Sequence, residues 1–180
     1  MNENNALLNN ITFQFSISKQ LLEYHLTSLK QEEYRWLSPN AGLYIKEENG
    51  EWYADLPETE AYHIGTPSLA WTLWHITFWW KMVLDHAFGA GTLTKEEIKV
   101  HEDVEAVKTV IHSLIAKWEE VLMNLKEEEL YSKAYTAFPF NNEVEFHQLA
   151  SWLNLELMKN AAEIGYVRFE YASVKKIVLW

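Results

Sequence analysis

The segment from Thr66 to Phe88 constrains the fold most, because apolar and aromatic side chains lie on every side of the helix that it is expected to form. Thr66 is a suitable N-cap, Pro67 is favoured at the first helical position, and the Gly-Ala-Gly sequence at residues 89–91 ends the helix. A helix that is apolar all round has to be covered by other elements. We therefore expect this helix to be the most buried element of the chain.

His75 lies in the middle of this segment, four residues after Trp71 and four residues before Trp79. Helical spacing places the three side chains on one face, so the imidazole cannot easily reach solvent and needs a polar partner. A metal ion is one such partner, and a hydrogen bond to another helix is the other. The pattern alone leaves both explanations open.

Three further segments have the spacing of amphipathic helices, and they cover about residues 10–36, 102–125 and 142–172. In the last of them, Asn142 is expected to be the N-cap, because Glu145 follows three residues later as in a capping box. Four long helices with apolar stripes predict an all-α four-helix bundle. The chain offers no Gly- or Pro-rich linker, so a single domain is expected to cover residues 1–180.

Residues 43–54, between the first two helices, predict a small β-hairpin. The Asn49-Gly50 pair suits a two-residue turn, and aromatic and β-branched residues flank it. An isolated hairpin is only marginally stable in water. We therefore expect Trp52 and its neighbours to pack on the helices or on a second subunit.

Charge and composition exclude several classes of function. The chain has 26 acidic and 15 basic residues, and the resulting formal charge of −11 opposes binding to nucleic acid or to an anionic membrane. Because cysteine is absent, disulfides, a cysteine nucleophile and thiolate metal sites are excluded, and any metal must have nitrogen and oxygen ligands. The start MNENNALLNN lacks the pattern of a signal peptide, and no uninterrupted apolar run could span a membrane, so a cytoplasmic location is expected.

The order of the helices and several residues resemble the DinB/YfiT-like superfamily of metal-dependent hydrolases. The resemblance covers nearly the whole chain, and it is carried by His75, by the sequence Asn-Ala-Ala-Glu-Ile-Gly at residues 160–165 and by the helix order. It implies a four-helix bundle, often dimeric, in which a histidine of the second helix and an H-x-x-x-H pair of the fourth helix bind a divalent metal. It also implies that some members are transferases that use small bacterial thiols.

Within this resemblance, His75 matches the ligand of the second helix, but the fourth helix departs from the pattern. When Gly165 is set against the family's glycine, the two histidine positions fall on Lys159 and Glu163. A carboxylate can replace an imidazole as a ligand, whereas a protonated lysine cannot bind a cation. The usual site of three histidines is therefore absent.

A site with both nitrogen and oxygen ligands could replace the missing three-histidine site. Glu156, Asn160 and Glu163 lie on one edge of the apolar face of the fourth helix. His75, Asn160 and Glu163 are thus candidate ligands of a divalent ion such as Zn, Ni, Mn or Fe, with Glu156 as an outer ligand or base. The alternative is a polar rim that forms hydrogen bonds between helices and a salt bridge with a basic residue of the same helix.

Two functions are compatible with these residues. In the first, a divalent ion activates water or a bacterial thiol for attack on a small electrophile, and Glu163 or Glu156 assists proton transfer. In the second, the metal has been lost, and the chain is a binding or stress-associated protein that holds an apolar small molecule without catalysis.

Either function needs a pocket near His75. We expect Trp71 and Trp79 to line this pocket, together with His63 from the preceding loop and His25 from the inner face of the first helix. A small molecule is then the expected ligand or substrate, and neither nucleic acid nor a membrane is an expected partner. Apolar residues in the hairpin and at positions 174–180, together with the resemblance, also predict a homodimer.

Overall fold

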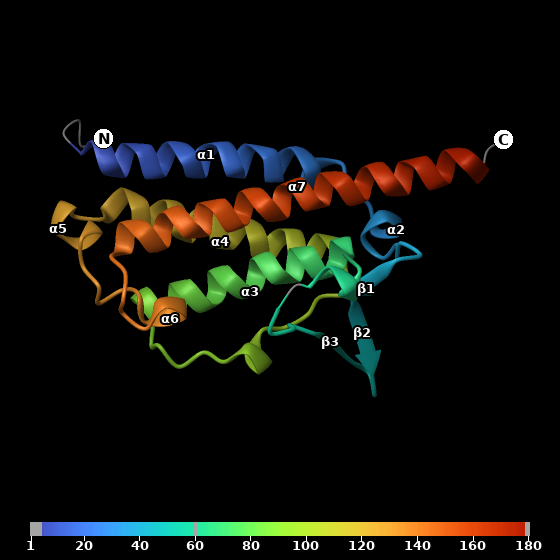
Figure 1. Cartoon of the computed structure of the whole chain (residues 1–180), viewed down its shortest axis with the longest axis horizontal. Helices are drawn as coiled ribbons and strands as arrows, with labels where there is room; N and C mark the ends of the chain where they lie inside the picture. The colour runs from blue at the N-terminus through green and yellow to red at the C-terminus, as the bar shows by residue number, and fades with distance from the viewer. Residues whose placement is uncertain (1–4, 60, 179–180) are drawn as a thin grey trace.

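The computed structural model describes residues 5–59 and 61–178, and this part of the chain is mostly helical (Figure 1). In chain order its elements are α1 (Ala6–Thr27), α2 (Gln31–Tyr34), β1 (Ala41–Leu43), β2 (Ile45–Glu48), β3 (Glu51–Ala54), η1 (Tyr62–Ile64), β4 (Thr66–Pro67), α3 (Leu69–Phe88), η2 (Lys95–Glu97), α4 (Val104–Asn124), α5 (Glu127–Leu130), α6 (Ala137–Phe140) and α7 (Phe146–Val178). The expected helical class is confirmed. The described part has seven α-helices rather than the expected four, because single-turn helices lie in the connections.

The four long helices form a closed ring of neighbours, in which α1 packs against α7 and α4, and α3 packs against α4 and α7. On α1 and α7, Ile11 lies beside Asn154. Further along both helices, His25 lies beside Arg168. The first and last long helices are therefore parallel neighbours, whereas α3 runs opposite to them (Figure 1).

Helix α3 is covered on nearly all sides, as the sequence predicts. Thirteen of its 20 residues are buried, against six of 22 in α1 and seven of 21 in α4. Trp71 and Trp80 each expose only 1% of their surface. The core therefore surrounds α3, and any polar side chain inside this helix must find its partners within the protein.

The start of α3 differs from the expectation. Thr66 and Pro67 form the short strand β4, which pairs in parallel with β1. Because these two residues are extended, the N-cap moves to Ser68, whose hydroxyl accepts a hydrogen bond from the backbone N–H of Trp71 at 3.2 Å. The expected N-cap at Thr66 is therefore wrong by two residues.

Two other expected helix ends are also wrong. The first helix ends at Thr27 rather than near residue 36, and α2 is a separate single turn after it. The last helix begins at Phe146 rather than after Asn142. Asn142 has a positive φ of 59°, whereas an N-cap residue is normally extended.

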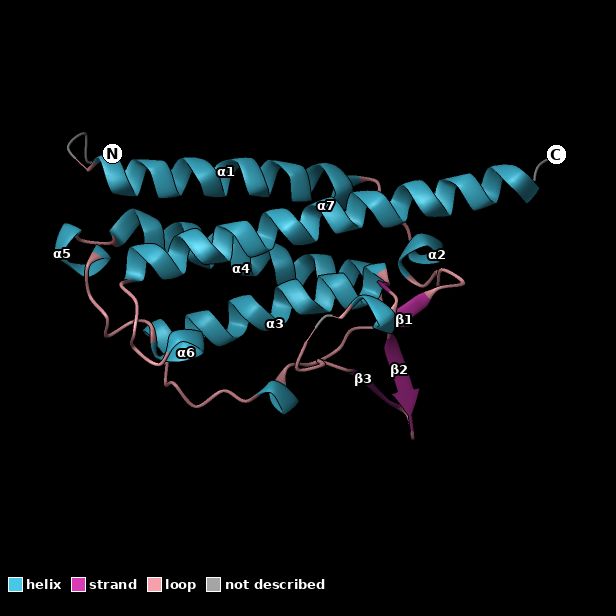
Figure 2. Cartoon of the chain, in the orientation of Figure 1, coloured by secondary structure: helices cyan, strands magenta, loops and turns pink. Residues whose placement is uncertain are grey.

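The hairpin is confirmed at the predicted turn. Strands β2 and β3 pair antiparallel from Ile45 opposite Ala54 to Glu48 opposite Glu51. Asn49 and Gly50 have φ values of 55° and 82°, as a turn of type I′ requires. Figure 2 shows both small sheets at one end of the long helices.

Trp52 packs on the helical part of the protein, which was one of the two expected arrangements. Its side chain is half-buried against the core, and the guanidinium of Arg35 lies 4.3 Å from the centre of its ring. A cation over an aromatic face stabilises this contact. The hairpin is thus anchored without a second subunit.

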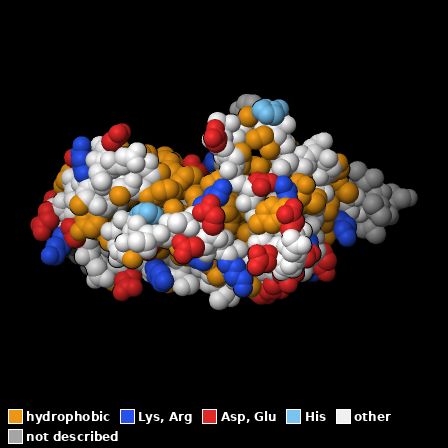
Figure 3. Space-filling view, turned by 90° about the horizontal axis from the view of Figure 1, so that it is seen from below, with side chains coloured by type: hydrophobic (Ala, Val, Ile, Leu, Met, Phe, Trp, Pro, Cys, Tyr) orange, Lys and Arg blue, Asp and Glu red, His pale blue; other side chains and the backbone are white. Residues whose placement is uncertain are grey.

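The surface carries charges of both signs. On the face drawn in Figure 3, basic side chains lie among acidic ones, and apolar groups reach the surface between them. Among the helices of the described residues, none combines the length and the apolar character that a bilayer crossing requires. Leu179 and Trp180, at the end of the apolar segment 174–180, lie outside the described residues.

Arg168 on α7 connects three helices. Its guanidinium donates hydrogen bonds to the Glu33 carboxylate of α2 at 2.7 and 3.2 Å. It also donates to the backbone carbonyl of His25 in the last turn of α1 at 2.6 Å, and to the Ser28 hydroxyl at 3.1 Å. Carbonyls in the last turn of a helix lack partners within the helix. Arg168 therefore satisfies the end of α1 while it holds α2 against α7.

We expect Arg168→Met to lower the free energy of unfolding by about 3 kcal/mol, because it leaves the buried Glu33 carboxylate without its cation. The matched control is Lys19→Met, which breaks a more exposed ion pair with Glu119 and should cost less than about 1 kcal/mol. Urea denaturation of both variants measures these differences. Equal losses in the two variants would contradict the assigned role of Arg168.

The stability of the fold should also fall in mild acid. Burial, and then the positive charge of Arg168, lower the pKa of His25. As the pH falls below about 6.5, the unfolded chain takes up a proton at this residue before the folded chain does, so the free energy of unfolding decreases. His25→Gln should therefore reduce the loss of stability between about pH 7 and about pH 5.5. Denaturation curves across this range measure the slope, and a slope unchanged from the wild type would contradict the prediction.

Candidate functional site

His75 lies in the interior between α3 and α7, and only 1% of its surface is exposed. Its Nε2 accepts a hydrogen bond from the indole N–H of Trp79 at 2.7 Å. Its Nδ1 lies 3.2 Å from the side-chain oxygen of Asn160 on α7. The structure therefore brings together His75 and Asn160, which are both candidate metal ligands.

The hydrogen bonds determine the protonation of the imidazole. An indole N–H only donates, so Nε2 must be the unprotonated nitrogen, and the proton of the neutral ring is on Nδ1. This N–H donates to the oxygen of Asn160, whose amide nitrogen in turn donates to the Glu156 backbone carbonyl at 2.8 Å. The arrangement joins α3 to α7 by a neutral imidazole with a defined tautomer.

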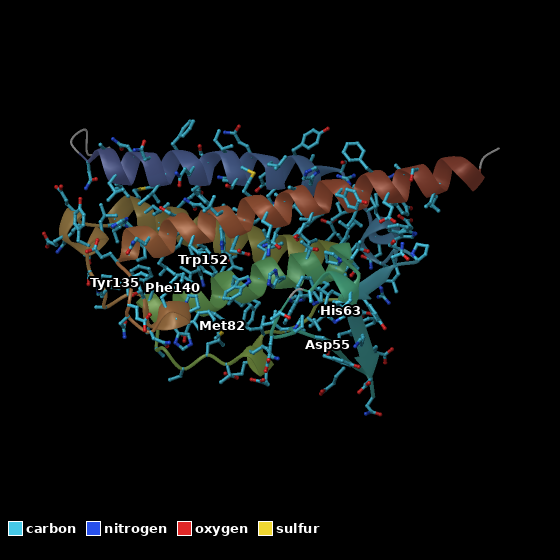
Figure 4. All side chains as sticks on the ribbon, viewed as in Figure 1. Asp55, His63, Met82, Tyr135, Phe140 and Trp152 are labelled. Atoms are coloured by element: carbon cyan, nitrogen blue, oxygen red, sulfur yellow. The ribbon has the colours of Figure 1, made fainter. Side chains whose placement is uncertain are left out.

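Aromatic residues enclose this imidazole. The ring of Trp71 stacks on it with centroids 4.6 Å apart, and Trp79 meets it edge-on at 5.8 Å. Trp79 also contacts Trp152, which extends from α7 toward α3 (Figure 4). The Trp71 indole N–H donates to the backbone carbonyl of Asp55 at 2.6 Å. Both predicted pocket tryptophans thus lie against His75, and Trp71 belongs to the packed core.

Glu156, Lys159 and Glu163 of α7 are half-buried. Glu163 and Lys159 line a groove of about 320 Å³ between β4 and α7, together with Thr66, Pro67, Ala162, Tyr166 and Val167. The ammonium of Lys159 lies 3.1 Å from the Glu156 carboxylate. This i, i+3 salt bridge and the hydrogen bond between His75 and Asn160 are both features of the polar-rim alternative.

The two remaining predicted pocket residues lie elsewhere. His25 is buried on α1 against Gly165, where a Cβ would lie only 2.9 Å from the ring. Gly165 follows Asn160 by five residues, which corresponds to a rotation of roughly 140° around α7, so His25 and His75 contact different sides of that helix. His63 is exposed in η1, near the hairpin end of the molecule (Figure 4).

The donor set does not fit a divalent ion in this arrangement. Metal coordination needs an imidazole lone pair, and that of Nε2 already accepts the Trp79 N–H. Across residues 5–59 and 61–178, no three His, Cys, Asp or Glu side chains gather as a metal-binding group. The set of His75, Asn160 and Glu163 therefore stays a prediction, and it requires Trp79 to turn away from the imidazole.

Sequence reasoning treated Trp79 as a pocket wall and missed its hydrogen bond to His75. The spacing of four residues was a usable signal, because side chains at i and i+4 are neighbours on a helix. Two lysines were also missed, Lys81 on α3 and Lys117 on α4, which line one groove of the surface. Their proximity depends on how α3 packs on α4, and no local pattern reports it.

Comparison with known proteins gives one match. A family model described as the DinB superfamily matches residues 14–164, which include His75, Asn160 and Glu163. No significant match was found among curated proteins or among solved structures. Because the family model covers most of the chain, this chain belongs to the DinB superfamily.

Proposed function

We propose that this chain is a DinB-superfamily protein that binds a small molecule without a metal, and that His75 has a structural role. The observation that carries the proposal is the hydrogen bond from Trp79 to Nε2 of His75. It occupies the lone pair that a metal would need, while Nδ1 donates to Asn160. Satisfying both nitrogens of a buried imidazole stabilises the contact between α3 and α7.

The charge beside this site supports the same proposal. Lys159 occupies one of the two positions at which the resemblance implies a histidine ligand, and its ammonium pairs with Glu156. A divalent cation bound next to an ammonium would be repelled, and a protonated lysine offers no lone pair. The carboxylate of Glu156 is then used within α7 rather than as a base.

A metal-dependent hydrolase or thiol-dependent transferase is the second candidate. It is favoured by the position of Asn160, which presents an oxygen toward His75 from the facing helix, and by membership in the family. In this case Trp79 would turn away from the imidazole, His75, Asn160 and Glu163 would hold the ion, and the Glu163 or Glu156 carboxylate would accept a proton. The bound ion would supply Lewis-acid activation of water or a thiol.

Several grooves offer room for a small molecule, and one of about 1000 Å³ lies between α1 and α4. The groove between β4 and α7 has a volume of about 320 Å³, and the groove along the contact of α3 and α4 has a volume of about 880 Å³. Both values lie in the usual range for small-molecule sites, roughly 300 to 1,000 Å³. A binding function therefore does not require the core around His75 to open.

Metal content and thermal stability separate the two candidates. Protein purified without a chelator or polyhistidine tag should contain no stoichiometric metal, and added Zn or Ni should leave its melting temperature unchanged. His75→Ala should lower the free energy of unfolding by about 1–3 kcal/mol with or without metal, because it leaves Trp79 and Asn160 without their partner.

Two further variants make this test specific. Trp79→Phe keeps an aromatic ring but removes the N–H donor, so stabilisation by Zn in this variant alone would identify the indole as what blocks a latent site. Glu163→Gln keeps the size of the side chain and removes its charge. Stoichiometric metal in the wild type that is lost in both His75→Ala and Glu163→Gln would overturn the metal-free proposal in favour of the second candidate.

We also propose that the protein forms a homodimer through the outer surface of α1 and α7. This surface, called here the α1–α7 face, exposes large apolar side chains: Phe13, Ile17 and Tyr24 on α1, and Leu155, Tyr166 and Phe169 on α7. Phe13 and Phe169 expose 66% and 79% of their surface. A monomer rarely leaves so many large apolar groups exposed on neighbouring elements.

Light scattering of the wild type at micromolar concentration should therefore give twice the chain mass of 21.2 kDa. The double substitution Phe13→Lys and Phe169→Lys should produce monomers, because it places charges in the interface. Leu37→Lys is the control, since Leu37 is a half-exposed apolar residue on neither helix. A wild-type monomer, or a dimer that survives the double substitution, would contradict the assignment of this face.

A further inference from the structure

A groove of about 880 Å³ follows the contact between α3 and α4, and we call it the α3–α4 groove. Its walls come from one side of each helix and from the segments after them. The lining residues are Lys81, Leu84, Asp85, Phe88 and Gly89 of α3 and its end, Leu93, Val110, Ser113, Leu114, Lys117, Glu120, Val121 and Asn124 of α4, and Leu125, Glu129 and Tyr135. It is separate from the His75 site, which faces α7.

Two lysines face each other across this groove. Lys81 is half-buried on α3, and Lys117 lies on α4. Burial, and then the charge of Lys117, lower the pKa of Lys81. Among the described residues, no carboxylate forms an ion pair with either amine, although the chain has more acidic than basic residues. The two ammonium groups therefore repel each other, and a carboxylate group placed between them would relieve that repulsion.

Two of the three carboxylates in the lining already accept hydrogen bonds. Asp85 accepts from the backbone N–H groups of Thr92 and Leu93, each at 2.9 Å. Glu129 accepts from the backbone N–H of Lys126 and from the hydroxyl of Tyr135, both at 2.8 Å. Glu120 is the third, and it is exposed. Asp85 and Glu129 therefore already have hydrogen-bond donors from the protein.

Beyond the lysines, the lining includes a series of apolar side chains besides Asp85, Glu120, Asn124 and Glu129. From Lys81 toward the end of α3 the wall passes Leu84 and Phe88, and from Lys117 toward the end of α4 it passes Val121 and Leu125. Phe88 stacks on Tyr135, with ring centroids 5.1 Å apart, and closes this end. The cations and the apolar wall thus form one amphipathic site.

We propose that the α3–α4 groove binds a long-chain carboxylate. Its carboxylate group lies between Lys81 and Lys117, and its hydrocarbon tail follows the apolar wall toward Phe88 and Tyr135. This inference rests on the proposed small-molecule-binding function and assigns its ligand class. Charge-assisted hydrogen bonds would hold the head, and burial of apolar surface would hold the tail. A polyanion is disfavoured by the net charge of −11, which repels it from the rest of the surface.

The test is titration calorimetry of the full chain with decanoate below its micellar concentration. Wild-type protein should bind one decanoate per chain, and bound decanoate should raise the melting temperature. Acetate, which has the head without the tail, and 1-decanol, which has the tail without the charge, should both bind much more weakly. The double substitution Lys81→Gln and Lys117→Gln should lower the affinity for decanoate by about tenfold or more.

Two single variants complete the design. Val121→Asp places a negative charge against the tail and should abolish binding, whereas Lys30→Gln removes an exposed lysine between α1 and α2 and should change nothing. Circular dichroism of each variant confirms that it is folded.

Three results would overturn the inference: no saturable binding of decanoate, equal affinity for decanoate in the double lysine variant, or equal binding of 1-decanol. If decanoate does not bind and added Zn or Ni also leaves the melting temperature unchanged, this ligand class is rejected but the metal-free proposal is not. Stoichiometric metal at His75 would reject that proposal, whatever decanoate does.

Discussion

The structure depends on one buried imidazole. Helix α3 is apolar on nearly every side, so a polar group at its centre must be satisfied inside the protein, and leaving it unsatisfied would cost about 1–3 kcal/mol. His75 meets this requirement with one partner from its own helix, Trp79, and one from the facing helix, Asn160. The second contact also sets the rotation of α7. When Asn160 points at His75, the side chains of Lys159 and Glu163, which precede and follow it in the chain, line the groove beside β4.

Nε2 of His75 can either accept the hydrogen bond from Trp79 or bind a metal ion, but not both at once. A lone pair on Nε2 that accepts an indole N–H is unavailable to a cation, and Trp79 has a fixed place on the helix one turn after His75. Under the proposed metal-free function, His75 keeps a role because its two hydrogen bonds connect α3 to α7. Membership in the DinB superfamily and a structural His75 are compatible for this reason.

The features of the fold that depend on interactions between residues close in the sequence were predicted correctly. The Asn49-Gly50 turn, the hairpin register and the burial of α3 are confirmed, because turn chemistry and apolar periodicity act over a few residues. The prediction of where the first helix ends was wrong, because Arg168, which is distant in the sequence, donates a hydrogen bond to the His25 carbonyl in the last turn. Asn160 was identified from the sequence because it is a polar residue at the edge of the apolar face of the last helix. The hydrogen bond of Trp79 was not found, since it depends on a side-chain rotamer, and the lysine pair was not found because packing between helices creates it.

The parallel pairing of α1 with α7 has a consequence for how the protein is made. Two contacts across this pair, Ile11 with Asn154 and His25 with Arg168, each join residues 143 positions apart. Contacts between such distant segments form slowly, and exposed apolar surface favours aggregation in the meantime. On the ribosome, Ile11, Phe15 and Leu22 of α1 emerge before α3, α4 and α7, and α7 is made after the other three long helices. Helix α1 of the nascent chain therefore lacks its main packing partner until α7 has been synthesised.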